Sequence, residues 1–187
     1  MKTINQISTS FLEVKKSKFI SFLSPFKDYE NLLNELKQKY PKARHFVTAF
    51  RYLNEQNQIV EGSSDDGEPR GSSGRPTLKV LEGNDLINVG VITVRYFGGI
   101  LLGVGGLVKA YSDVLNLAIK DADLLDFSFV FEYDFCVDYN KTREIEYLIK
   151  KYDIFVVDRK FGIEGIEYKI RDSAEKINLM KEKLWKN

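Results

Sequence analysis

"VITVRYFGGILLGVGGLVKAYSD" (Val91–Asp113) changes from one hydrophobic pattern to another across a run of glycines. Its first residues continue an apolar run that begins at Ile87 and ends at Phe97, which is typical of a buried strand. Beyond the glycines, apolar side chains recur at helical spacing at Leu107, Ala110, Tyr111, Val114, Leu115 and Ala118. The stretch therefore predicts a buried strand that turns through Gly98–Gly106 into a long helix.

The flanking residues predict further strands and helices. Upstream, we expect a strand or hairpin over 11–26, a helix over 28–40, strands over 45–53 and 59–62, and a short helix over 75–85. Downstream of 126, the order strand, helix, hairpin, helix follows, with Asn140 and Ser173 as the expected N-caps. We therefore expect an α+β fold with two domains, 1–125 and 126–187, that meet near Asp123–Asp126.

The composition indicates a soluble, cytoplasmic protein without a broad charged surface. The chain has 187 residues, with 28 basic against 27 acidic side chains and a formal net charge of +1. This balance disfavours binding through a wide cationic face, although a local patch remains compatible with it. No apolar run approaches the roughly 20 residues that a membrane helix needs, and no signal peptide is visible. The single cysteine, Cys136, excludes an intramolecular disulfide and is expected to be a small buried side chain.

The polar segment Ser64–Pro76 is the first candidate site. Asp65, Asp66 and Glu68 place three carboxylates within four positions, a set that could hold Mg²⁺ or Ca²⁺ or supply acid and base groups. The spacing does not match an EF-hand loop, so we expect no metal and no other cofactor. The alternative is a solvated surface loop of turn-forming residues.

The same segment also carries cations and hydroxyls. Arg70 and Arg75 could neutralise the neighbouring carboxylates in place of a metal, and Ser72 and Ser73 offer hydrogen-bonding hydroxyls. Rigid prolines alternate with glycines over these residues, which suits a defined backbone path better than a flexible tether. The segment is therefore interpreted as an ordered loop.

The glycine turn is the second candidate site. Gly103, Gly105 and Gly106 leave backbone N–H groups uncovered where the helix begins, Arg95 ends the preceding strand, and Lys109 lies in or near the first helical turn. Together these groups could bind a phosphate or another anion. Neither a P-loop nor a dinucleotide fingerprint is present, because the lysine of the first and the third glycine of the second are missing. The alternative is that the glycines serve only close packing of helix against sheet.

Zinc and hydrolase sites are disfavoured. His45 is the only histidine, and no Gly-x-Ser-x-Gly motif surrounds any serine.

Two of these segments resemble a known family. "DDGEPRGSSGRPTL" (65–78), followed by "VITVRYFGGILLGVGGLVKAYSDVLNLAI" (91–119), closely resembles the IMPACT family, which includes the bacterial YigZ-type proteins. "KKSKFI" and "RHFVTAFRY" are also similar to the amino domain of that family. This chain has Gly71-Ser72-Ser73-Gly74 where members usually carry Gly-Thr-Ala-Gly, and Arg44-His45-Phe46 where members often carry a His-His-Cys-like stretch.

The resemblance implies both a fold and a role. It implies an amino domain with the ribosomal protein S5 domain 2-like fold and a carboxyl domain with a ferredoxin-like fold, similar to the last domain (domain V) of elongation factor G. Eukaryotic members are tied to translational control through an activator of a stress-responsive initiation-factor kinase. For bacterial members, association with RNA or the ribosome is the implied role.

Three functions remain open on these grounds. The first is a non-enzymatic, translation-associated protein that contacts RNA, the ribosome or a translation regulator through the Ser64–Pro76 loop and the Gly98–Lys109 turn. The second is a phosphoryl-transfer or phosphate-binding enzyme that uses Mg²⁺ on Asp65 or Asp66. The third is a protein–protein regulator that uses the sheet of the carboxyl domain. The candidate binding residues are Asp65, Asp66, Glu68, Arg70, Ser72, Ser73, Arg75, Arg95, Gly103, Gly105, Gly106 and Lys109.

Overall fold

The computed structural model describes residues 1–185 and separates into two compact units, Met1–Phe127 and a second unit that begins at Ser128. The first unit is built on a five-stranded sheet in the order β2-β3-β6-β4-β5, in which every neighbouring pair is antiparallel. Its strands are β2 (Ser8–Val14), β3 (Ser17–Pro25), β6 (Val89–Tyr96), β4 (His45–Leu53) and β5 (Ile59–Ser64). The predicted hairpin and strands are confirmed, and β5 extends two residues further than expected, into the start of the polar segment.

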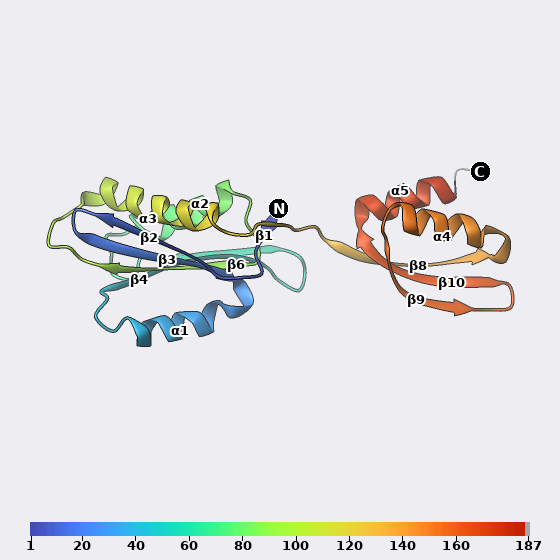
Figure 1. Cartoon of the computed structure of the whole chain (residues 1–187), viewed down its shortest axis with the longest axis horizontal. Helices are drawn as coiled ribbons and strands as arrows, with labels where there is room; N and C mark the ends of the chain where they lie inside the picture. The colour runs from blue at the N-terminus through green and yellow to red at the C-terminus, as the bar shows by residue number, and fades with distance from the viewer. Residues whose placement is uncertain (186–187) are drawn as a thin grey trace. The chain divides into compact units, whose positions relative to one another are not determined.

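Helices cover both faces of this sheet (Figure 1). The helices α2 (Gly74–Gly83) and α3 (Gly103–Lys120) lie on one face, and α1 (Tyr29–Lys39), preceded by the short helix η1 (Phe26–Asp28), lies on the other. Strand β6 is the middle strand, so its residues from Val89 to Arg95 are buried whichever face they point to. This two-sided burial explains the continuous apolar run in the sequence. The ends of the unit are joined by a two-stranded pairing of β1 (Lys2–Thr3) with β7 (Leu125–Asp126).

The second unit packs two helices on one face of a three-stranded sheet (Figure 1). The sheet has the order β8-β10-β9, with strands β8 (Val130–Asp138), β10 (Gly165–Ser173) and β9 (Phe155–Phe161), all antiparallel to their neighbours. The two helices are α4 (Thr142–Lys151), which the short helix η2 (Tyr139–Lys141) precedes, and α5 (Ala174–Leu184). Its core is separate from those of the first unit and centres on Ile145, Tyr168, Ile170 and Met180. The predicted order of strand, helix, hairpin and helix is confirmed.

Two expectations for this unit are wrong. Cys136 is exposed, because side chains alternate along β8 and its neighbours Phe135 and Val137 take the buried face. Asn140 does not cap α4, because the chain first forms the short helix η2 and Lys141 then occupies the N-cap position without a side-chain bond. No helix within residues 1–185 is long and apolar enough to cross a membrane.

The expected cap at Ser173 is confirmed and is testable. Its side-chain oxygen accepts a hydrogen bond from the backbone N–H of Lys176 at 3.4 Å, in the first turn of α5. Because this bond is long, we expect Ser173→Ala to lower the free energy of unfolding of the second unit by about 0.5–1 kcal/mol. Urea unfolding followed by the fluorescence of Trp185 measures this change, and Asn140→Ala is the matched control, expected to lose less than about 0.5 kcal/mol. Equal losses from the two substitutions would contradict the capping role.

Candidate functional site

Asp65 caps the amino end of α2 from within the polar loop. Its carboxylate accepts hydrogen bonds from the backbone N–H groups of Gly71 (2.7 Å), Ser73 (3.1 Å) and Gly74 (2.8 Å), and from the Ser73 hydroxyl (2.7 Å). Burial by itself raises the pKa of Asp65, but the bonds from Gly71, Ser73 and Gly74 outweigh it and hold that pKa below its ordinary value. The loop is therefore folded around an ionised carboxylate.

Asp66 ties the loop to the start of β4. One carboxylate oxygen accepts a hydrogen bond from the backbone N–H of Phe46 at 2.6 Å. The carbonyl oxygen of Asp66 lies 2.7 Å from His45 Nδ1, and since a carbonyl only accepts, this ring nitrogen carries the proton and donates it. Asp66 also has a positive φ of 44°, a conformation that Asp tolerates better than most residues.

Glu68 forms a buried ion pair beneath the loop. Its Oε1 atom lies 2.5 Å from Arg95 Nη1 and accepts a hydrogen bond of 2.8 Å from the Tyr111 hydroxyl. The side chains of Glu68 and Arg95 are only 3% and 6% exposed, so water screens this pair weakly. The Arg95 guanidinium also lies 5.4 Å from the ring centre of Phe19 and 5.7 Å from that of Phe97. Burial, and then the negative charge of Glu68, raise the pKa of Tyr111, which therefore stays a neutral donor.

The three carboxylates are thus all engaged within the protein. Arg70 and Arg75 do not neutralise them, because Arg95 pairs with Glu68 and backbone N–H groups bond to Asp65 and Asp66. Among the described residues, neither Arg70 nor Arg75 forms an ion pair, and no cluster of His, Cys, Asp and Glu is arranged to hold a metal ion. The acidic residues of the loop shape its backbone.

The glycines of the turn serve different purposes. At Gly98 a Cβ atom would lie 2.1 Å from the carbonyl carbon of Lys16, so close packing requires glycine there. Gly99 and Gly103 have φ values of +85° and +71°, which favour glycine by conformation. Gly105 has neither constraint, because its φ is not positive and no atom lies within 4 Å of a Cβ built there. Because Gly105 has no side chain, the backbone in the first turn of α3 is left uncovered at this position.

Lys109 lies near the first turn of α3. The helix begins at Gly103, so Lys109 falls in its second turn, where its side chain is 78% exposed and pairs with Asp113 at 3.0 Å.

Two hollows are lined by residues of both the loop and α3. The first, called here the loop–turn cavity, has a volume of about 350 Å³. It is lined by Glu68 and Pro69 of the loop, by Phe97, Leu101, Leu102, Gly103, Val104 and Leu107 of the turn and of α3, and by Arg44, His45 and Arg95. The second, called the α2–α3 groove, has a volume of about 470 Å³ and is lined by Gly71, Arg75, Pro76, Lys79, Val80, Val108 and Ser112. The expectation that the polar loop is ordered and set against the glycine turn is confirmed.

The two serines of the loop differ. The Ser73 hydroxyl donates to Asp65, whereas the Ser72 hydroxyl is buried and has no hydrogen-bond partner within residues 1–185. The sequence did not point to Lys79 in the α2–α3 groove, nor to Tyr111 as the buried partner of Glu68. Tyr111 matched the apolar face of a helix, and its partner Glu68 is 43 positions away in the chain.

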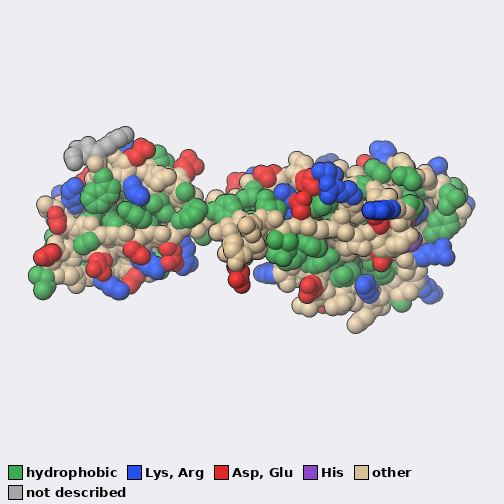
Figure 2. All heavy atoms as spheres, turned by 180° about the vertical axis from the view of Figure 1, so that it is seen from behind, with side chains coloured by type: hydrophobic (Ala, Val, Ile, Leu, Met, Phe, Trp, Pro, Cys, Tyr) green, Lys and Arg blue, Asp and Glu red, His purple; other side chains and the backbone are tan. Residues whose placement is uncertain are grey.

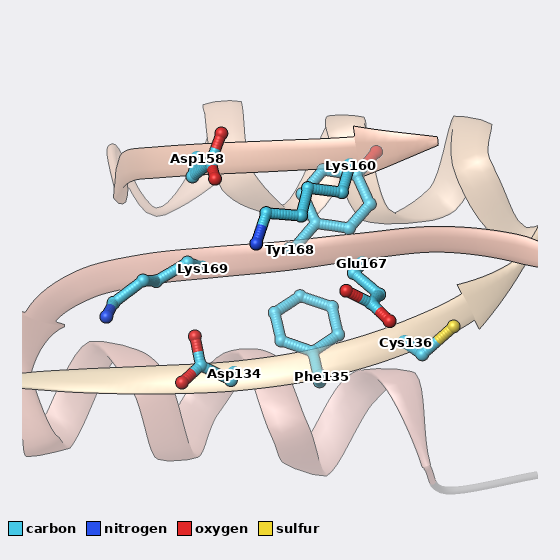
Figure 3. A pocket seen from close by; sticks show the side chains of 8 residues that line it. All are labelled: Asp134, Phe135, Cys136, Asp158, Lys160, Glu167, Tyr168 and Lys169. Carbon is cyan, nitrogen blue, oxygen red and sulfur yellow. The ribbon is translucent and has the colours of Figure 1, made fainter. Parts of the chain in front are cut away.

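A further hollow of about 420 Å³ lies on the open face of the second unit (Figure 3). Figure 3 shows acidic side chains, among them Asp134, Asp158 and Glu167, interspersed with Lys160 and Lys169 on the three strands. Glu132, further along the same face, pairs with Lys169 at 2.7 Å and with Arg171. These bonds lower the pKa of Glu132 to about 2. Because opposite charges are interspersed here, this face offers a partner no strong charge of a single sign.

Comparison with known proteins gives consistent matches. The Impact N-terminal domain family matches residues 15–119. The chain is 36% identical over 154 residues to an IMPACT family member of Haemophilus influenzae, a match covering 80% of this chain and 74% of that protein. It is 34% identical over 152 residues to the IMPACT family member YigZ of Escherichia coli, with the same coverage.

One solved structure resembles this chain over nearly its whole length. A crystal structure of a hypothetical protein matches 98% of this chain and 90% of its own, with 29% identity and a TM-score of 0.64. A structure of the two-domain translational regulator Yih1 matches 62% of this chain and 47% of its own at 24% identity, with a TM-score of 0.42, which is too distant to support a functional comparison.

Proposed function

This chain belongs to the IMPACT family, and on that premise we propose that it is a non-catalytic protein of the cytoplasm that binds RNA on or near the ribosome. The contact surface comprises the Ser64–Pro76 loop, the α2–α3 groove and the start of α3. A translation-regulating protein docked on the same surface is the competing partner, and the test below distinguishes the two.

The division of charge in the loop supports this proposal. Its carboxylates are engaged internally, whereas Arg70 and Arg75 are exposed and unpaired within the described chain. Arg75 and Lys79 line the α2–α3 groove beside the hydroxyl-bearing Ser112. Lys79 pairs with Glu82, but this lysine is 58% exposed, and exposed pairs exchange readily for a phosphate. Cations and a hydroxyl in a shallow groove suit the phosphate oxygens of a nucleic acid backbone.

Outside the α2–α3 groove, no broad basic region is visible on the described residues drawn in Figure 2, so the cationic patch formed by Arg75 and Lys79 is small. On the faces seen in Figure 2, basic and acidic side chains are interspersed over each unit, in keeping with the net charge of +1. A protein of this kind is expected to contact few phosphates, and therefore to bind RNA with a shallow dependence on salt.

The enzymatic alternative has less support. Asp65 and Asp66 would have to leave their backbone partners to coordinate Mg²⁺, which would open the cap of α2 and the tie to β4. The third alternative, regulation through the sheet of the second unit, has only the mixed charges of that face to support it.

Finer fold assignments belong to the same proposal. We assign residues 1–125 to the ribosomal protein S5 domain 2-like fold and residues 126–187 to the ferredoxin-like fold, similar to domain V of elongation factor G. For the second, the support is that β8 and β9 run parallel on either side of β10, as in a split β-α-β unit.

The RNA contact is tested by removing the groove cations. We expect Arg75→Ala/Lys79→Ala to weaken binding to purified ribosomes and to structured ribosomal RNA about tenfold, and to reduce the slope of log affinity against log salt by about 2. The measurement is a fluorescence anisotropy titration at several salt concentrations. Lys27→Ala/Lys37→Ala, which removes the same charge from the opposite face of the sheet, is the control.

The outcomes separate the candidate partners. An unchanged affinity and salt slope in the groove variant would contradict phosphate contact. Binding to ribosomes but not to ribosomal RNA, lost in the groove variant, would assign the surface to a protein partner.

A further inference from the structure

We propose that the loop–turn cavity is a binding site for a small amphipathic anion, a carboxylate or phosphate attached to an apolar body. This goes beyond the proposed contact with RNA, because the cations that test that contact, Arg75 and Lys79, line the α2–α3 groove, which has no lining residue in common with the loop–turn cavity. The substitutions that test the two activities are therefore separate.

The walls of the cavity favour an apolar ligand. Its lining is mainly apolar, from Phe97, Leu101, Leu102, Val104 and Leu107. Its volume of about 350 Å³ falls at the small end of the roughly 300–1,000 Å³ that ligand pockets occupy. Several of these side chains are left in water, most of all Leu101, which is 82% exposed, and Val104, which is 57% exposed. An apolar occupant would cover surface that is otherwise unfavourably hydrated.

The amino end of α3 supplies the attraction for an anion. Leu102 holds the N-cap position and has no side-chain oxygen, so no side-chain cap satisfies the first N–H groups of this 18-residue helix. The first turn also contains no acidic residue to balance the positive end of the helix dipole. Gly103 and Gly105 place no Cβ over the backbone there, and the space next to each is open.

A buried cation in the same wall is an independent indication. Arg95 lines the cavity and is 5% exposed, and its Nε atom has no hydrogen-bond partner within residues 1–185. A buried donor without an acceptor is unfavourable, so an oxygen that reached it would be stabilising. Glu68 balances the charge of Arg95, and exposed Arg44, which forms no ion pair in the described chain, adds a further positive charge to the lining.

The apolar lining and the positively charged end of the cavity together define the class of ligand. The anionic group lies against the start of α3 and the arginines, and the apolar body lies against Phe97, Leu102 and Leu107. An alcohol of the same chain length has the apolar body without the charge, and inorganic phosphate has the charge without the apolar body. Both are expected to bind more weakly than the amphipathic anion.

The test uses the full-length protein, labelled with ¹⁵N, and probes of known chemistry. Octanoate, octyl phosphate, octan-1-ol and inorganic phosphate are each titrated below the concentration of micelle formation, with amide and Arg95 Nε–H shifts as the readout. We expect octanoate or octyl phosphate to shift the resonances of Val104 to Leu107 and of Arg95, with an affinity about tenfold above that of octan-1-ol. Comparison of the two anions identifies the preferred head group.

Substitutions at Gly105 control for folding. Gly105→Asp places a negative charge at the open start of α3, which favours the helix but repels an anionic ligand, and Gly105→Asn has nearly the same shape without the charge. We expect Gly105→Asp to weaken octanoate binding about tenfold relative to Gly105→Asn, with no fall in the melting temperature. Arg75→Ala/Lys79→Ala is expected to leave octanoate binding unchanged.

Four results would overturn the proposal. They are no binding of either amphipathic anion, equal affinity for octanoate and octan-1-ol, equal affinity for inorganic phosphate and the amphipathic anions, and shifts confined to residues outside the cavity. None of these results bears on RNA binding, which the groove variant tests separately.

Discussion

Glu68→Gln is expected to destabilise the first unit by about 3–5 kcal/mol, because it leaves a buried guanidinium without its counter-charge. Glu68 is the residue that neutralises Arg95, and both side chains are more than nine-tenths buried. Glutamine has nearly the same shape, so the loss reports the charge and not a cavity. Tyr111 keeps a possible acceptor in the glutamine oxygen, so its hydrogen bond contributes little to the difference.

The measurement is urea unfolding with separate probes for the two units. Trp185 is the only tryptophan and lies in the second unit, so its fluorescence serves as the internal control and is expected not to change. Backbone NMR signals of residues 1–127 follow the first unit.

Two further variants locate the origin of the loss. Tyr111→Phe removes one hydrogen bond and is expected to lose about 1 kcal/mol. Glu68→Gln/Arg95→Met removes both charges and is expected to recover part of the stability lost in Glu68→Gln, because a neutral pair in the same space needs no counter-charge. A loss below about 1 kcal/mol in Glu68→Gln would show that Arg95 finds another way to be solvated, and would refute the buried ion pair as a main support of the loop.

Asp65→Asn is expected to lower the stability of the first unit by about 2–4 kcal/mol, since one carboxylate serves four hydrogen-bond donors. The asparagine side chain has one carbonyl oxygen and one NH₂ group, and the latter points a donor at backbone N–H groups that are also donors. The backbone at Gly74 cannot easily move to find another acceptor, because it is buried and packed closely against Ser64. A Cβ built on Gly74 would lie 2.7 Å from the backbone of Ser64.

The pH dependence gives an independent check on Asp65. Its pKa is lowered in the folded protein, so its contribution to stability is complete above the unfolded value of about 3.9 and is lost as the pH falls through the folded value. We therefore expect the difference in unfolding free energy between Asp65→Asn and the parent protein to be constant from pH 5 to pH 7 and to shrink below about pH 4. Asp123→Asn, at an exposed position of the same unit, is the control. A difference that persists undiminished at pH 2 would mean that the charge of Asp65 is not what holds the loop.

The local elements were the most predictable part of the molecule. The strand His45–Leu53 has the predicted bounds, Ser173 caps the last helix, and the long helix begins within the glycine run. Hydrophobic period, turn residues and caps act over a few residues, so a single sequence contains the information needed to read them. The family motifs at 65–78 and 91–119 could also be recognised from the sequence, because each is a continuous segment of the chain.

The partners of the charged residues were not predictable in this way. The nearest cations to the acidic loop in the sequence are Arg70 and Arg75, yet the buried partner of Glu68 is Arg95, 27 positions away. Cys136 looks apolar in the sequence but is exposed, since the pleat of β8 and the position of α4 and α5 determine which residues are covered.

By itself, the sequence determined the elements, the family, and the presence of an ordered polar loop followed by a glycine-rich helix start. The tertiary structure alone decided that the carboxylates of the loop bond to groups within the protein, that its arginines stay exposed, and that an apolar cavity forms beside the uncapped start of α3. The physical reason is that secondary structure follows from interactions between near neighbours in the chain, whereas charge pairing and burial depend on the sheet order β3-β6-β4 and on the helix laid over it. That order brings Glu68, Arg95 and Tyr111 together from three separate segments.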